Sequence, residues 1–152
     1  MKKVVCWVLP ISVIAIMILT GNYLLGHRRS GDFTYYISDS KAIIREYNKR
    51  AEGEVVIPGT LGSHTVVKIG ERAFADCDYL TSVKIPNSVT DIAESAFASC
   101  SSLTTVTIPD SVISIGRRAF FSSALSIVMI PESVVSIGES AFLCSLESLS
   151  GC

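Results

Sequence analysis

The chain has 152 residues, of which 13 are Lys or Arg and 14 are Asp or Glu, so its formal net charge at pH 7 is −1. This balance lacks the basic excess of nucleic-acid-binding proteins, and we expect no nucleic-acid partner. The residues that follow the apolar N-terminus suffice for one domain.

An uncharged, apolar segment of 22 residues runs from Val4 to Leu25, with two Lys before it and two Arg shortly after it. As a helix it would be about 33 Å long, enough to cross a hydrocarbon core of about 30 Å. We therefore predict that residues 1–26 form a signal anchor or transmembrane helix. The alternative is a signal peptide that is cleaved to give a secreted protein.

The basic residues around this segment do not fix its orientation. A literal count slightly favours a cytoplasmic C-terminal side, but long domains translocate largely regardless of charge. We predict a single-pass membrane protein with its N-terminus inside and the rest of the chain outside, joined by a short linker at residues 27–31.

Residues 32–68 have strand-like patterns without a clear repeat. Phe33–Ile37 is followed by a polar turn at Ser38–Ser40, then by the apolar runs Ala42–Tyr47 and Val55–Ile57. Runs of this kind, separated by polar turns, predict three strands.

Residues 69–152 repeat with a period of 22 or 23 residues. Each of four Phe residues follows an Ala, and three Ile-Pro pairs and an Ile five residues before each Phe keep the same step. A period in the twenties predicts a solenoid whose units stack on one another. We expect about three to four coils, the last one incomplete, and an atypical N-terminal unit that caps the core.

Within one unit, Val83 and Ile85 alternate with Lys84, which predicts a strand that Pro86 ends. Glu94–Phe97 has the composition of a single helical turn. The predicted fold class is therefore a repeat solenoid, mostly β with short helical turns. Its expected core consists of the repeating apolar positions Ile69, Phe74, Leu80, Val83, Ile85, Ile92, Phe97, Leu103, Val106, Ile108, Ile115, Phe120, Val128, Ile130, Ile137 and Phe142.

A small residue follows the second Ile of each unit: Gly70, Ala93, Gly116 and Gly138. Glycine where the chain changes direction suggests a backbone angle that other residues avoid. Ala93 is then either slightly strained or a sign that the angle is ordinary.

The motif Ile-Pro-x-Ser-Val-x-x-Ile-Gly-x-x-Ala-Phe-x-x-Cys-x-x-Leu-x-x-Val resembles the BspA-type (Treponema-type) leucine-rich repeat of bacterial and protist surface proteins. The resemblance is specific over Ile69–Phe142 and looser from about Asp32. It implies a leucine-rich-repeat solenoid, with residues 32–68 as its N-terminal cap. It also implies surface display and adhesion to host proteins, extracellular-matrix proteins or other cells.

The repeat shortens toward its end, because the spacing from Phe to the next Leu falls from six residues to five and then to four. No further Ile-Pro follows. The last coil then frays, is covered by another chain, or is the remnant of a longer array. An uncovered strand edge promotes association, so one expected partner is a second copy, through self-association at the uncapped C-terminal coil.

Exposed positions should also stack into rows. One predicted row and a nearby aromatic form the candidate protein-binding surface, which consists of Lys84, Thr107, Met129 and Tyr79. Other rows are Asp91, Ser114 and Ser136, and the charged ladder Glu71, Glu94, Arg117 and Glu139.

Cys77 and Cys100 occupy the same position of successive units. Stacking would bring their Cα atoms to about 5 Å, within disulfide range, and an external compartment would permit the bond. The competing interpretation is that both are small core fillers.

Catalytic chemistry has little support, because His27 and His64 are the only histidines and neither lies in a catalytic motif. We expect no enzyme, no cofactor and no metal site. The predicted function is a membrane-anchored, surface-exposed repeat protein that mediates protein–protein interaction and adhesion. The alternatives are a truncated repeat protein with a structural role only, and a secreted repeat protein.

Overall fold

The computed structural model describes residues 26–50 and 52–143. The predicted membrane segment Val4–Leu25 lies outside the described residues. Within them, no helix has the length and apolar character needed to cross a membrane.

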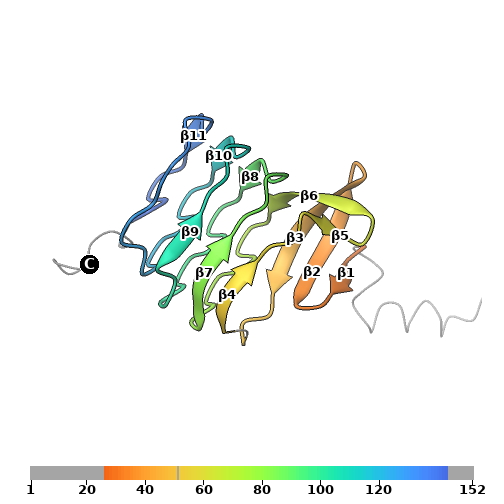
Figure 1. Cartoon of the computed structure of the whole chain (residues 1–152), viewed down its shortest axis with the longest axis horizontal. Helices are drawn as coiled ribbons and strands as arrows, with labels where there is room; N and C mark the ends of the chain where they lie inside the picture. The colour runs from red at the N-terminus through yellow and green to blue at the C-terminus, as the bar shows by residue number, and fades with distance from the viewer. Residues whose placement is uncertain (1–25, 51, 144–152) are drawn as a thin grey trace, which may run out of the picture.

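The described chain is a mostly β solenoid of about four turns (Figure 1). Sheet A has eight strands in the order β1-β2-β3-β6-β8-β10-β11, with β5 paired to β6, and sheet B has the order β4-β7-β9. The strand bounds are β1 Arg28–Ser30, β2 Phe33–Ser38, β3 Lys41–Tyr47, β4 Gly53–Val56, β5 Thr60–Leu61, β6 His64–Ile69, β7 Leu80–Lys84, β8 Asp91–Ile92, β9 Thr105–Thr107, β10 Ser114–Ile115 and β11 Ser136–Ile137.

Each regular coil contributes one strand to sheet B and one to sheet A, so Figure 1 shows two rows of strands along the same axis. The coils begin at β4, β7, β9 and, for the fourth, at Leu125. All pairings between coils are parallel, and apart from a register shift between Gly53 and Glu54 of β4 they align equivalent residues, as in Val83 opposite Val106 and Ile92 opposite Ile115. Equivalent residues of successive coils therefore lie side by side, and the sequence period becomes a set of columns.

The N-terminal end is formed differently. The β2–β3 hairpin, with β1 antiparallel to β2, precedes the first coil, and β3 pairs in parallel with β6. The predicted linker at residues 27–31 therefore contains strand β1, Arg28–Ser30. The hairpin turn is made by Asp39 and Ser40, whose φ angles are positive.

An aromatic column runs through the core of the solenoid. The rings of Tyr47, Phe74, Phe97, Phe120 and Phe142 stack with successive centroid distances of 4.9, 4.8, 5.1 and 5.2 Å. The first unit thus joins the repeat, because Tyr47 of β3 occupies the place of a repeat Phe. Stacked aromatic pairs contribute about 0.5–1.5 kcal/mol beyond the area that they bury.

Most of the expected core positions are buried in the structure. The buried ones are Ile69, Phe74, Leu80, Val83, Ile85, Ile92, Phe97, Leu103, Val106, Ile108, Ile115 and Phe120. Val128 and Phe142 are partly buried against the core. The prediction is wrong for Ile130 and Ile137, which are 43% and 48% exposed. Both lie in the fourth coil, where the described chain provides no further coil to cover them.

The predicted helical turns are also wrong, because the described residues contain no helix. Residues such as Ser95 and Ser99 have positive φ angles of 54° and 59°, which no helix accommodates. Their backbone N–H groups bond to the next coil instead: Ser95 N donates to Arg117 O at 2.9 Å, and Ser99 N donates to Phe121 O at 2.8 Å. Each coil thus closes by tight turns that are stabilised by its neighbour.

The glycine column has a steric cause. Gly70, Gly116 and Gly138 do not have positive φ angles. A Cβ added at Gly116 would lie 2.5 Å from the backbone N of Glu94 and 2.6 Å from the carbonyl carbon of Ala93. Glycine at this position therefore permits close approach of adjacent coils, and the backbone angle is ordinary.

Candidate functional site

The outer face of sheet B presents two rows of side chains. Register aligns Glu54, Ser82 and Thr105 in one row, and Val56, Lys84 and Thr107 in the other. The Lys84 Nζ lies 2.7 Å from the Glu54 Oε1, with both side chains about half exposed. An exposed ion pair of this kind contributes at most about 1 kcal/mol to the free energy of unfolding. Its main effect is therefore on the alignment of β4 with β7.

The structure brings only part of the predicted binding surface together. Lys84 and Thr107 are neighbours on β7 and β9. Met129 lines a groove with Thr107 on the far side of β9 and is 80% exposed. Tyr79 is 60% exposed but lies in the turn before β7, where its carbonyl accepts a hydrogen bond from Gly53 N.

Sheet B ends at β9 because the turn that leads into the fourth coil is one residue shorter than in the earlier coils. In two earlier coils this turn is closed by bonds between residues three apart, from Leu80 N to Cys77 O and from Leu103 N to Cys100 O. In the fourth coil the equivalent residues, Ser123 and Leu125, are only two apart. Residues 124–130 consequently form no strand, and no backbone hydrogen bond joins them to β9 within the described chain.

A groove of about 450 Å³ opens between β9 and this displaced segment. It is lined by uncharged residues, namely Thr104, Thr105, Val106, Thr107, Ile108, Ser126, Ile127 and Met129. The Thr107 carbonyl accepts a bond from Ile85 N and therefore faces β7. Since successive residues of a strand direct their polar groups to opposite sides, the N–H and C=O of Val106 face the groove.

The outer face of sheet A is a polar ladder. Asp91 accepts hydrogen bonds from Ser114 Oγ at 2.7 Å and from Thr90 Oγ1 at 2.6 Å. Partial burial opposes ionisation of Asp91, but these two bonds and the charge of Lys68 outweigh it and lower its pKa. Arg117 lies 2.7 Å from Glu94 of the preceding coil, and that hydrogen bond and charge raise the Arg117 pKa.

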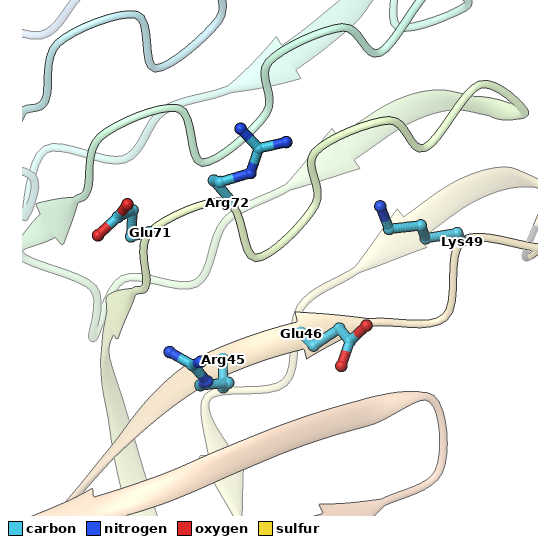
Figure 2. A pocket seen from close by; sticks show the side chains of 5 residues that line it. All are labelled: Arg45, Glu46, Lys49, Glu71 and Arg72. Atoms are coloured by element: carbon cyan, nitrogen blue, oxygen red, sulfur yellow. The ribbon is translucent and has the colours of Figure 1, made fainter.

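A charged hollow of about 490 Å³ lies between the N-terminal hairpin and the first coil (Figure 2). It is lined by Arg45 and Glu46 of β3, Lys49 of the following loop, and Glu71 and Arg72 of the turn after β6. Two of its cations already share one carboxylate oxygen, the Asp76 Oδ2, at 3.1 Å from Lys49 and 3.6 Å from Arg72. The hollow is a mixed-charge surface without a nucleophile or a histidine among its lining residues.

Cys77 and Cys100 are free, buried thiols, so the predicted disulfide between them is wrong and the core-filler interpretation holds. The Cys100 Sγ instead donates to Phe74 O at 3.0 Å, which directs the thiol to the backbone. Burial raises the pKa of Cys77 to about 11 and the pKa of Cys100 to about 12. Both residues are core fillers with low thiolate content at neutral pH.

The two histidines lie apart. His64 begins β6, where its Nδ1 is 3.2 Å from Ser40 O, and His27 packs near Tyr36 at the N-terminal edge. Among the described residues no group of three or more His, Cys, Asp or Glu is arranged to hold a metal ion.

Residues 63–150 match the family described as BspA type leucine rich repeat region, in six copies. The chain belongs to this BspA-type family. This family and its fold are generally non-enzymatic binding scaffolds, in keeping with protein–protein interaction. No curated protein matches the chain.

Solved structures of bacterial leucine-rich repeat proteins share the BspA-type fold of this chain. A protein from Bacteroides capillosus is 32% identical with a TM-score of 0.70, covering 77% of this chain and 90% of that one. The T. pallidum leucine-rich repeat protein is 26% identical with a TM-score of 0.65, covering 79% and 68%. A Bacteroides ovatus protein is 31% identical with a TM-score of 0.57, covering 79% and 40%.

Sequence reasoning missed the groove of this BspA-type chain. The signal was the spacing of five residues between Phe120 and Leu125, one fewer than in the two coils before it. The motif Leu125-x-x-Val128-x-Ile130-Pro131 is otherwise intact, so pattern matching alone continues the sheet where the structure ends it.

Proposed function

We propose that this chain is a membrane-anchored, surface-displayed BspA-type repeat protein that binds other proteins through the outer face of sheet B and acts in adhesion. The observation that carries the proposal is the exposed, in-register face of β4, β7 and β9, with its rows of short polar side chains around the Glu54–Lys84 pair. Solenoid faces of this kind offer extended surfaces for partners.

The anchor in this proposal is Val4–Leu25, oriented with the repeats outside the cell. Its support is the length and lack of charge of that segment. Self-association through the last coil is part of the same proposal, because exposed apolar side chains such as Ile127 and Met129 lie there.

Display is tested by adding protease to intact cells that express the full chain. We expect external protease to remove the repeats while the N-terminal segment remains in the membrane fraction. Repeats that are protected in intact cells but digested after lysis would overturn surface display.

Binding is tested with the full chain in mild detergent over immobilised fibronectin, laminin and collagen. Thr107→Glu introduces a charge on β9 of the sheet B face, whereas Ser136→Glu places the same charge on sheet A. We expect wild-type binding to at least one of these proteins, a loss of tenfold or more with Thr107→Glu, and no change with Ser136→Glu. Absence of wild-type binding to all three, or equal effects of the two variants, would count against adhesion through sheet B.

A further inference from the structure

The edge of β9 is an open strand edge beside an apolar groove. The N–H and C=O of Val106 face this groove, and within the described chain no backbone hydrogen bond crosses it. Ile127 and Met129, on the opposite wall, are 76% and 80% exposed. Open edges with exposed apolar side chains pair readily with another strand.

The groove also differs from the rest of the surface in its charge. The outer face of sheet B carries the Glu54–Lys84 pair, and the outer face of sheet A carries the Glu94–Arg117 pair. None of the residues that line the groove is charged. In a pair with two-fold symmetry, each surface patch meets its own copy, and like charges brought together in this way are costly. An uncharged patch avoids that cost.

The chain itself contains a segment of matching chemistry. Ser126–Ile130 reads Ser-Ile-Val-Met-Ile, which is uncharged and rich in β-branched residues. Strands β7 and β9 carry Val at the position of Val128. The shortened turn before Leu125 holds this segment away from the β9 edge of its own chain, so the segment and the edge are both available.

We propose that two copies of this chain associate through the β9 groove about a two-fold axis, with residues 126–129 of each copy lying against β9 of the other. The partner is therefore a second copy of the chain, and the contact combines apolar packing of Ile127 and Met129 with pairing at the Val106 edge. This inference rests on the self-association proposed above and specifies its contact, whereas it does not depend on the binding of a foreign protein or on membrane anchoring.

The test compares two full-length variants in detergent by analytical ultracentrifugation, with the detergent contribution subtracted. Met129→Glu places like charges across the axis, and Val56→Glu places the same charge at an exposed position of the same face, on β4. Because both side chains are exposed, neither change should prevent folding, which circular dichroism checks.

We expect a wild-type dimer, a dimer in Val56→Glu, and at least a tenfold weaker dimer in Met129→Glu. A wild type that stays monomeric at about 100 μM would overturn the proposal, because any dimer would then have a Kd above about 100 μM. So would a dimer that Met129→Glu leaves intact, since the N-terminal segment or another face would then be responsible.

Hydrogen exchange supplies an independent readout of the geometry. The Val106 amide should exchange at least tenfold more slowly in the concentrated wild type than in the diluted one, and Met129→Glu should abolish this difference. Exchange at Val106 that does not depend on concentration would show that the β9 edge is not the contact.

Discussion

Replacing Phe97 with Ala removes the middle ring of the aromatic column. Phe97 is fully buried and stacks on Phe74 at 4.8 Å and on Phe120 at 5.1 Å. Truncation of a buried Phe costs about 3–5 kcal/mol, and two lost ring pairs at about 0.5–1.5 kcal/mol each place this site toward the upper end. We expect the free energy of unfolding to fall by about 4–5 kcal/mol.

Phe142→Ala is the matched control, because Phe142 is only partly buried and has one stacked neighbour, Phe120, at 5.2 Å. We expect a loss of about 1–3 kcal/mol there, scaled down from the fully buried case. Urea unfolding of the full chain in detergent, followed by circular dichroism, measures both changes. With a slope of about 2 kcal/mol per M, Phe97→Ala should lower the midpoint by about 2 M. Equal losses in the two variants would refute the view that stacking between coils carries this stability.

Gly116→Ala should lower the free energy of unfolding by about 1–3 kcal/mol, because its Cβ would overlap the preceding coil; thermal unfolding checks this, with Ala93→Gly as the milder comparison. Cys77 should react with iodoacetamide at pH 8 at least about 100-fold more slowly in the folded than in the urea-unfolded chain, because a pKa of about 11 against 9.0 lowers its thiolate content by that factor. Peptide mass spectrometry resolves Cys77 and Cys100 from the other cysteines. Stability should fall as pH rises from about 9, since unfolded thiols ionise there while the folded ones keep their protons up to about pH 11 and 12. The lowered pKa of Asp91 stabilises the fold above pH 3.8, and this contribution is lost as pH falls through the folded value; Asp91→Asn should therefore reduce the acid dependence measured by unfolding at pH 2–6.

The columns of the solenoid could be predicted from the sequence because a fixed period and parallel stacking place equal positions side by side. Phe74, Phe97 and Phe120 form one stack for this reason. The addition of Tyr47 to that stack could not be predicted, since it comes from β3, which lies outside the repeat.

The turns could not be predicted because local composition and hydrogen-bond partners disagree there. Glu94–Phe97 is helical in composition, but Phe97 N finds its acceptor in the next coil at 2.7 Å. A nearby coil offers bonds that a short isolated helix could not match, since helix nucleation is costly. The steric reason for Gly70, Gly116 and Gly138 could not be predicted either, because it depends on the distance between adjacent coils.

The candidate site was predicted only in part. The row from Lys84 to Thr107 follows from strand register, but the position of Met129 depends on a single missing residue in the turn before Leu125. The repeat motif can be matched across this missing residue, so the motif alone does not reveal that the deletion displaces a strand.

The bonds between turns also have a consequence for how such a chain can change in length during evolution. Each coil donates from the same positions to the same positions of the next, as Phe74 N does to Ala96 O and Phe97 N to Ala119 O. A duplicated block of 23 residues would find every donor and acceptor already in place, whereas loss of one residue removes a strand from its sheet, as residues 124–130 show. Insertion or loss of whole units therefore preserves every bond between coils, so the array can lengthen or shorten without redesign of its core.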